Sequence, residues 1–255
     1  RDYGLTFAEH YARTGIQYQK FNTVYQLMAL KQEHPDQLAA AKMFLMVPDY
    51  LNYLLCGVAA NEYTNASTTA LVGADSKDWD DAMIAMLGLP RDIFQSIKTA
   101  GTVLGHLTPE MQAKVGFDAE VILPATHDTG SAFLAVPARD EFAAYLSSGT
   151  WSLLGVENAA AITSADSCVA NFTNEGGYEY RYRYLKNIMG LWMIQSVRRE
   201  LGEQNGTRPS FPELIAAAKE AADFASCVDP NDSRFLAPTS MIAEVKAACA
   251  ATHQP

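Results

Sequence analysis

The sequence predicts an α/β chain in two parts, and three observations lead to this fold class. The first 118 residues carry mainly helical patterns. A short apolar, β-branched segment, Glu120–Leu123, then predicts a buried strand that leads through a polar turn into a helix of small residues. From Phe142 onward strands come first and helices follow. Buried strands mixed with helices in this way indicate layered α/β or α+β packing.

Helix start and stop signals divide the first part of the chain. Proline is favoured in the first turn of a helix and glycine just after its end, and both recur here. Gly57 and Gly88 each follow an expected helix directly. The helices expected are 23–33, 36–44, 50–56, 79–87 and 109–115.

The turn Thr126–Thr129 follows the predicted strand and opens a helix over 130–136. Ligands of α/β folds bind where strands end in this way, and an ionised Asp128 there can take a proton from a substrate hydroxyl. The alternative is that Asp128 only caps the helix, and the local pattern favours this. A hydrolase triad through His127 is excluded by the lack of a G-x-S-x-G elbow. We place a domain boundary near Pro137–Glu141.

The second part begins with the strands 142–147 and 151–157, which Ser148-Gly149 can join as a hairpin. Aromatic and charged residues alternate over 178–185, which predicts a further strand with its tyrosines on one face and Arg183 on the other. Such a strip can also stack bases, but the acidic chain favours the plain strand. The helices expected next are 188–201, 210–222 and 239–251.

Charge and composition narrow the function. The net charge of -10 argues against binding nucleic acid through a basic surface. No apolar run approaches the ~20 residues of a membrane span. The four cysteines are far apart without a C-x-x-C pair, so we expect no zinc site or disulfide framework and a reducing cytoplasm.

Three further segments offer ligand contacts. The amides of the turn Ser147–Thr150 can converge on an anion, although an ordinary hairpin explains the same residues. Gln195 shares a helical face with Ile188 and Trp192 and needs a partner there, from the backbone or from a ligand. Asn187 can cap that helix. The segment Glu62–Thr69 is either a solvated loop or one that binds a polyol.

The order of these segments resembles the FGGY carbohydrate kinase family, and within it the rhamnulokinase group. The resemblance runs from Arg13 to Phe235, and 174–192 looks specific to that group. The matching stretches are Arg13–Tyr18, Lys20–Thr23, Pro48–Leu51, Glu62–Thr69, Thr126–Thr129, Tyr145–Leu153, Asn174–Gly177, Arg181–Trp192 and Pro230–Phe235.

The resemblance implies an actin-like, ribonuclease-H-like fold of two domains. Residues 1–138 would be the C-terminal part of the first, sugar-binding domain, and 139–255 the N-terminal part of the second, nucleotide-binding domain. It implies transfer of the γ-phosphoryl group of ATP, with Mg²⁺, to the 1-hydroxyl of L-rhamnulose in L-rhamnose catabolism.

The resemblance also assigns roles to residues. His127, Asp128 and Thr129 would contact the sugar, with Asp128 as the base. Thr150, Asn187 and Gln195 would contact ATP. No residue of the chain is assigned to a metal, and no nucleic acid or membrane partner is implied.

The chain opens on Arg1 and lacks two parts of the family pattern, the N-terminal phosphate hairpin and the C-terminal adenosine segment. We therefore expect an internal section of a longer protein, truncated at both ends, with little kinase activity alone and with uncovered apolar faces. The alternatives are a kinase of the family for another ketose, such as L-fuculose or a xylulose, and a non-catalytic module that keeps the fold.

Overall fold

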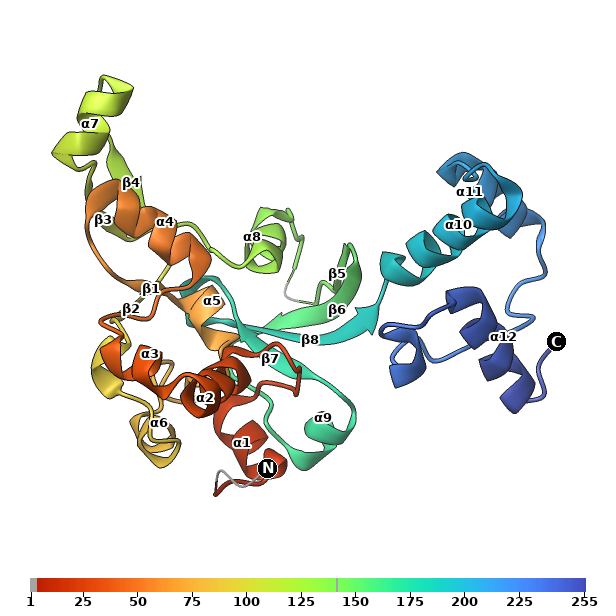
Figure 1. The fold of residues 1–255 in the computed structure, drawn as a ribbon, viewed down its shortest axis with the longest axis horizontal. Helices are drawn as coiled ribbons and strands as arrows, with labels where there is room; N and C mark the ends of the chain where they lie inside the picture. Colours follow the sequence, from red (N-terminus) through yellow and green to blue (C-terminus); the bar gives the residue numbers. More distant parts are fainter. Residues whose placement is uncertain (1–3, 141) are drawn as a thin grey trace. The chain divides into compact units, whose positions relative to one another are not determined.

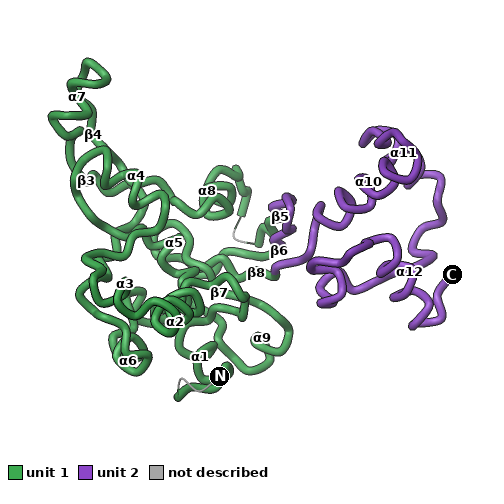
Figure 2. Tube along the Cα trace, in the orientation of Figure 1, with its two compact units in different colours: residues 1–145, 155–186 green, residues 146–154, 187–255 purple. Residues whose placement is uncertain are grey.

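The computed structural model describes residues 4–140 and 142–255 and divides them between two compact units. Unit 1 combines the chain up to Tyr145 with Gly155–Lys186, and unit 2 combines Leu146–Leu154 with Asn187–Pro255 (Figure 2). Segment 155–186 therefore packs with the first half of the chain, beyond the predicted boundary. Glu141, at the end of that boundary, and Arg1, at the start of the chain, lie outside the described residues.

Helices are the main regular structure of the first 118 residues, as predicted (Figure 1). Helix α4 ends at Gly57, whose backbone takes the left-handed conformation with φ of 74°. The predicted helices 36–44 and 79–87 are shorter than expected, because Phe44 and Trp79 instead form isolated β-bridges. The helices of unit 1 are α1 (Phe7–Thr14), α2 (Thr23–Glu33), α3 (Pro35–Ala40), α4 (Val47–Cys56), α5 (Tyr63–Ser67), α6 (Asp81–Met86), α7 (Pro109–Val115), α8 (Asp128–Ala135) and α9 (Ala165–Val169).

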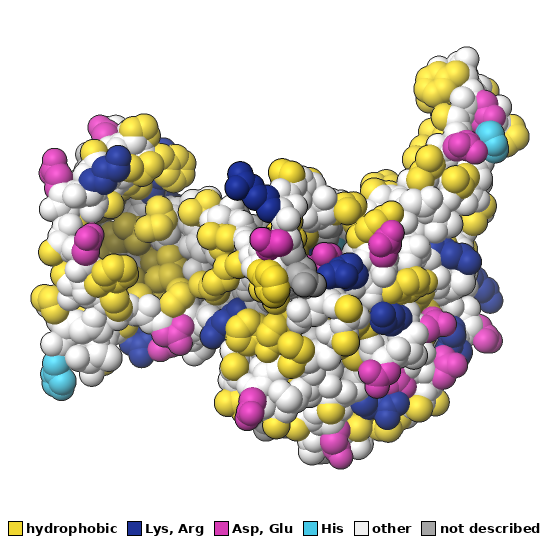
Figure 3. Space-filling model, turned by 180° about the vertical axis from the view of Figure 1, so that it is seen from behind, with side chains coloured by type: hydrophobic (Ala, Val, Ile, Leu, Met, Phe, Trp, Pro, Cys, Tyr) yellow, Lys and Arg dark blue, Asp and Glu magenta, His cyan; other side chains and the backbone are white. Residues whose placement is uncertain are grey.

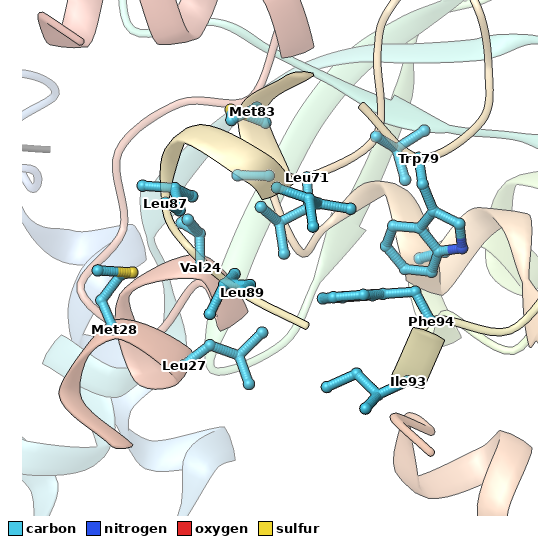
Figure 4. Packing of buried hydrophobic residues seen from close by; sticks show 14 of the residues in the cluster. Val24, Leu27, Met28, Leu71, Trp79, Met83, Leu87, Leu89, Ile93 and Phe94 are labelled. Atoms are coloured by element: carbon cyan, nitrogen blue, oxygen red, sulfur yellow. The ribbon is translucent and has the colours of Figure 1, made fainter. Parts of the chain in front are cut away.

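The core of unit 1 is an apolar cluster in which α2 packs against α6 and the segment that follows it (Figure 4). Leu71 is fully buried at its centre, and Trp79 and Phe94 meet at 4.9 Å between ring centroids. Each fully buried large apolar side chain contributes roughly 1.5–3 kcal/mol to the free energy of unfolding. Tyr63 and Ala66 of α5, the helix that supports the site described below, belong to this cluster.

Two small sheets lie in unit 1. Strand β1 (Asn61–Glu62) runs parallel to β2 (Ile97–Lys98), and β3 (Val103–His106) runs antiparallel to β4 (Glu120–Ile122). The β4 strand was predicted, but its full burial is wrong, because Val121 is buried whereas Ile122 is 51% exposed. One face of β4 is therefore buried and the other is exposed.

A third sheet has the strand order β5-β6-β8-β7. Its members are β5 (Tyr145–Ser148), β6 (Trp151–Asn158), β7 (Thr173–Gly176) and β8 (Tyr182–Met189). The predicted pairing of 142–147 with 151–157 is confirmed, although β5 begins only at Tyr145. Gly155 is required by close packing within this sheet, since a Cβ there would lie 2.3 Å from the carbonyl oxygen of Tyr184.

The predicted strand 178–185 is wrong in its first half. Tyr178–Tyr180 form a 3₁₀ turn (η2), in which Glu179 and Tyr180 take positive φ angles of 51° and 58°. Within β8 the predicted alternation holds, since Tyr182 and Tyr184 lie on one face of the strand and Arg183 on the other, but Tyr182 and Arg183 are both buried. Both faces of β8 are covered here, so the alternation of tyrosine and arginine does not indicate which side chains are exposed.

Unit 2 is built mainly from α10 (Leu191–Asn205), α11 (Phe211–Glu220) and α12 (Met241–Ala251), and all three helices were predicted. Helix α10 starts three residues later than expected, because Ile188 still belongs to β8. The carboxylate of Glu200 on α10 accepts hydrogen bonds from the Ser240 hydroxyl and the Met241 amide, each at 2.6 Å. This carboxylate ties α10 to the start of α12.

Apolar side chains are exposed on both units (Figure 3). On α4 they recur at helical spacing, with Val47 73% and Leu51 55% exposed, and Tyr50 and Leu54 each 49% exposed. None of the helices in the described residues is both long and apolar enough to cross a membrane.

Candidate active site

The predicted catalytic turn lies between β4 and α8 in unit 1. The N-cap residue of α8 is His127, so Asp128 is the first residue of the helix and not its N-cap. The Asp128 carboxylate accepts a 2.6 Å hydrogen bond from the Thr129 amide, yet the side chain is 97% exposed. An exposed carboxylate at the positive end of a helix is ready to bind a substrate hydroxyl.

The side chain of Glu62 is fully buried beneath this turn and binds it through hydrogen bonds. Its Oε2 accepts hydrogen bonds from the Thr126 amide at 3.0 Å and the Thr126 hydroxyl at 2.9 Å. The same carboxylate accepts from the Thr64 amide and hydroxyl, at 3.0 and 2.5 Å, and so caps α5. One buried carboxylate thus joins the start of α5 to the residues before Asp128.

Thr64 adds a further hydrogen bond to this turn, at His127. Its hydroxyl oxygen accepts the His127 amide at 3.1 Å, and Gly130 of α8 lies so close that a Cβ there would be 3.4 Å from the Thr64 Cβ. Segment Glu62–Thr69 is therefore not a solvated loop, and its contact with a polyol stays a prediction. It is a buried strand and helix that support the turn.

Asp49 on α4 supports Glu62 in turn. Its carboxylate accepts the Glu62 amide at 3.1 Å and the Asn61 side-chain amide at 3.0 Å. Burial raises the pKa of Asp49 to about 6, because desolvation of the charged carboxylate outweighs these two hydrogen bonds. A line of polar contacts therefore leads from α4 through β1 to the turn.

The imidazole of His127 lies between two charged side chains of the sheet. Its Nδ1 is 3.4 Å from Nη1 of Arg183, and its Nε2 is 3.8 Å from Oε2 of Glu175. Burial lowers the pKa of His127, and the Arg183 charge lowers it further, whereas the carboxylates of Glu175 and Asp128 oppose this. His127 is 21% exposed and so keeps one accessible edge.

Arg183 is the largest fully buried side chain of the described residues. Its Nε donates to the Gly176 carbonyl at 3.0 Å, and Nη1 lies 3.1 Å from Oε2 of Glu175. This ion pair is close but not aligned as a hydrogen bond, so Glu175 Oε2 has no hydrogen-bond partner among the residues described. The other terminal nitrogen of Arg183, Nη2, also has none among them. Burial lowers the pKa of Arg183, while Glu175 opposes that effect.

Thr129, the third predicted sugar contact, is buried, with 6% of its surface exposed. Its hydroxyl donates to Asp128 Oδ1 at 3.3 Å. The structure thus brings His127, Asp128 and Thr129 together at one turn of unit 1.

The three predicted ATP contacts belong to unit 2. Thr150 is exposed in the turn between β5 and β6, and its carbonyl accepts the amides of Gly190 and Trp192, each at 3.2 Å. The Gly149 amide donates to the Trp151 carbonyl at 2.8 Å, so this amide is not free for an anion. The turn therefore caps the start of α10 with its carbonyls.

Two interpretations near α10 are wrong. Asn187 does not cap the helix, because it lies within β8 and Gly190 is the N-cap residue. Gln195 is exposed and not on a buried face, and Ile188 shares no helical face with it because the helix begins later. An exposed amide needs no partner within the protein, so it is available to a ligand.

Comparison with known proteins decides the family. The sequence model of the N-terminal domain of the FGGY family of carbohydrate kinases matches residues 5–135, and that of the C-terminal domain matches 144–250. This chain belongs to the FGGY family of carbohydrate kinases. The predicted mixed α/β kinase fold is thereby confirmed.

Individual FGGY relatives give a finer likeness. The chain is 53% identical over 244 residues to a rhamnulokinase of Oceanobacillus iheyensis and 55% identical to one of Halalkalibacterium halodurans, covering 96% of this chain in both cases. A Yersinia pestis rhamnulokinase is 45% identical over 94% of the chain. The predicted likeness to rhamnulokinases is confirmed. The chain spans about half the length of these relatives, 51% of the first two.

Solved FGGY structures agree on the fold. A xylulose kinase from Lactobacillus acidophilus superposes with a TM-score of 0.74 at 18% identity, covering 86% of this chain and 44% of the other. A carbohydrate kinase from Novosphingobium aromaticivorans gives 0.66 at 25% identity, covering 94% and 55%.

The family implies use of ATP, and the described residues fit a nucleotide and the expected Mg²⁺ unequally. The exposed Thr150 hydroxyl and Gln195 amide suit a nucleotide. No cluster of three or more acidic, histidine or cysteine side chains suited to a metal occurs in residues 4–140 and 142–255. Mg²⁺ commonly binds through phosphates and water with one or two carboxylates, so a dedicated cluster is not required.

Sequence reasoning missed three residues that shape this site. Glu62 was grouped with a polar segment of undecided role, although its position before Thr64-Asn65 is that of a helix cap. Arg183 was placed only on the strand face opposite the tyrosines, with no role in the site. Glu175 was noted only as part of the segment Asn174–Gly177. The pairing of Glu175 with Arg183 across β7 and β8 would have needed knowledge of the strand register.

Proposed function

We propose that this chain is the middle section of a rhamnulokinase, which transfers the γ-phosphoryl group of ATP to the 1-hydroxyl of L-rhamnulose. The observation that carries the proposal is the exposed carboxylate of Asp128, held at the start of α8 by the buried Glu62. Identity of 53–55% to rhamnulokinases supports the choice of sugar. Two residues of segment 174–192, the part of the resemblance specific to that group, lie against His127: Glu175 and Arg183.

Asp128 acts as the general base in this reaction. As the sugar oxygen forms its bond to the γ-phosphorus, the hydroxyl proton passes to the Asp128 carboxylate and the bond from phosphorus to the β-phosphate oxygen of ATP breaks. His127 and Thr129 orient the sugar beside this carboxylate. Catalysis of phosphoryl transfer is mainly positioning and charge stabilisation, so a rigidly held base is the contribution expected of this turn.

Thr150, Asn187 and Gln195 serve the nucleotide in this proposal. The Thr150 hydroxyl donates to a phosphate oxygen, and the exposed Gln195 amide offers both a donor and an acceptor. When bound, Mg²⁺ neutralises the charge that develops on the phosphate oxygens. The domain assignment, with 1–138 serving the sugar and 139–255 the nucleotide, is part of the same proposal. It is supported by the matches over 5–135 and 144–250.

The activity is proposed for a protein that carries this chain together with the further sequence found in its relatives, here called the full-length protein. Release of ADP by the full-length protein, followed with L-rhamnulose, L-fuculose and a xylulose, tests the substrate. We expect the highest kcat/KM with L-rhamnulose and little turnover by the 255-residue chain alone. A preference for another ketose would refute the choice of sugar, and full activity of the 255-residue chain would refute the need for the remaining sequence.

A further inference from the structure

Two charged residues of the segments that the resemblance singles out, Glu175 and Arg183, have no role in the reaction as described so far. In the structure they lie on β7 and β8, which pair antiparallel with Glu175 opposite Arg183. Both side chains reach the imidazole of His127. A cross-strand pair built from these segments therefore lies directly against a residue of the proposed sugar site.

The chemistry of Arg183 determines which nitrogen of His127 carries the proton. A guanidinium only donates hydrogen bonds, and its Nη1 faces His127 Nδ1 at 3.4 Å. Nδ1 must therefore accept, which leaves the proton of a neutral imidazole on Nε2. That nitrogen faces Oε2 of Glu175 at 3.8 Å, the acceptor oxygen that has no hydrogen-bond partner in the described residues.

This tautomer has a consequence for Asp128. His127 Nδ1 lies 3.5 Å from Asp128 Oδ1, close enough for a protonated Nδ1 to donate to the carboxylate. Oδ1 already accepts from the amide and hydroxyl of Thr129, so a charged imidazole would add a third donor and further stabilise the ionised carboxylate. A neutral imidazole with an unprotonated Nδ1 adds no such donor, and the exposed carboxylate remains basic enough to accept a proton from the substrate hydroxyl.

We propose that Arg183 and Glu175 are positioning residues for His127. Arg183 donates to Nδ1 and Glu175 places an acceptor opposite Nε2, so the ring proton stays on Nε2. The Arg183 charge keeps the ring neutral, and Asp128 can then accept the proton of the sugar hydroxyl. This inference rests on the proposed function of Asp128. Neither residue is placed against the substrate, since Arg183 is fully buried and acts through the imidazole.

The charges around His127 agree with this role. Four charged groups act on it: Glu175 from β7, Arg183 from β8, Asp128 from α8 and Glu62 from β1. The three carboxylates favour the charged imidazole, and Arg183 alone among them opposes it. Loss of the Arg183 charge should therefore raise the pKa of His127 towards the working pH range.

The variant Arg183→Met in the full-length protein tests this through the pH profile of kcat/KM for the sugar. The activity of the variant relative to wild type should fall as the pH falls, by about tenfold per pH unit below the raised pKa of His127. Arg183→Lys keeps the charge and should restore the wild-type profile. Glu175→Gln removes a carboxylate that favours the charged imidazole, so its profile should keep the wild-type shape. A loss of equal size at every pH would overturn the proposal.

Nitrogen NMR of labelled histidine reports the tautomer without any need for activity. In the full-length protein, the His127 resonances, assigned from His127→Asn, should be those of a neutral ring protonated at Nε2 near pH 7. A ring protonated at Nδ1, or charged at that pH, would overturn the proposal even if Arg183→Met fails to fold. If the tautomer is as stated but L-rhamnulose is not phosphorylated, the proposed function fails and the arrangement at His127 stands.

Discussion

The two turns that carry the candidate chemistry are held in different ways. The backbone of the turn before Asp128 donates hydrogen bonds to two buried side chains, those of Glu62 and Thr64. Glu62 is 0% and Thr64 1% exposed. The turn at Thr150 is held by its own backbone, through carbonyls that accept amides at the start of α10. Its Thr150 side chain is exposed.

In the proposed function, this difference matches the separate demands on the two turns. A base must stand at a fixed place, because a displacement of about 1 Å can cost a hundredfold in rate. Buried polar partners supply that precision, although each of them costs free energy if its partner is lost. An exposed hydroxyl and amide can adjust to a nucleotide as it binds. Side-chain changes near Asp128 should therefore affect rate and stability, and those in unit 2 mainly nucleotide affinity.

The largest effect should come from Asp128→Asn in the full-length protein. The amide cannot take the sugar proton, so kcat should fall by about 10³-fold, within the range of general-base contributions. The free energy of unfolding should be unchanged, because the side chain is 97% exposed. Steady-state ADP release and urea denaturation measure the two quantities. Asp36→Asn, an exposed carboxylate on α3, is the control and should leave both unchanged. Retained turnover in Asp128→Asn would remove Asp128 from the mechanism.

The next effect should come from Glu62→Gln. The amide nitrogen of glutamine cannot accept the hydrogen bonds now made by Glu62, so the turn loses part of its support. We expect kcat to fall by roughly a hundredfold with little change in sugar KM, and the free energy of unfolding to fall by about 1–3 kcal/mol. Thr126→Val removes one of the same contacts and should show a smaller loss of the same kind. An increase in KM alone would contradict a role in positioning.

Asp49 should make stability depend on pH. Its pKa of about 6 in the folded protein exceeds the ordinary value of 3.8, so the folded state binds the proton more tightly. Its contribution to the free energy of unfolding is thus greatest below pH 3.8 and is lost as the pH rises through 6, by up to roughly 3 kcal/mol.

Asp49→Asn removes this titration. Urea denaturation should be measured between about pH 4 and pH 7. The free energy of unfolding of wild type minus that of Asp49→Asn should fall as the pH rises and then level off. A difference that is constant over this range would show that Asp49 titrates normally.

The smallest effect should come from unit 2. Gln195→Ala removes an exposed amide, so the free energy of unfolding should change by less than about 0.5 kcal/mol. If the amide contacts the nucleotide, the KM for ATP should rise roughly five- to tenfold, the cost of about one hydrogen bond. Equal kinetics for ATP in both proteins would exclude Gln195 from the nucleotide site.

Local signals predicted the helices that begin at proline and end at glycine, such as α4 and α7, because those residues act within one turn of chain. They missed β1, β2 and β7, which are two to four residues long and are defined by partners distant in the sequence. Their stability comes from tertiary packing, which leaves little trace in local composition.

The residues of the candidate site also differ in whether local sequence signals could predict them. Asp128 was found because a strand, a polar turn and a helix follow one another in the sequence. Glu62 and Arg183 were not, because they are charged side chains buried by long-range contacts, an arrangement that local polarity argues against. Gln195 was noticed as a polar residue on an apolar face, although that face includes Ile188, which belongs to a strand.

The central claim is that Glu62 contributes to catalysis through the position of Asp128, and a double-mutant cycle on kcat tests it most directly. ADP release is measured for the full-length wild type, Glu62→Gln, Asp128→Asn and the double variant. If Glu62 acts only by placing the base, Glu62→Gln should have almost no further effect once Asp128 is replaced. If the two losses in kcat instead multiply, Glu62 acts independently of Asp128 and the account of the site is wrong.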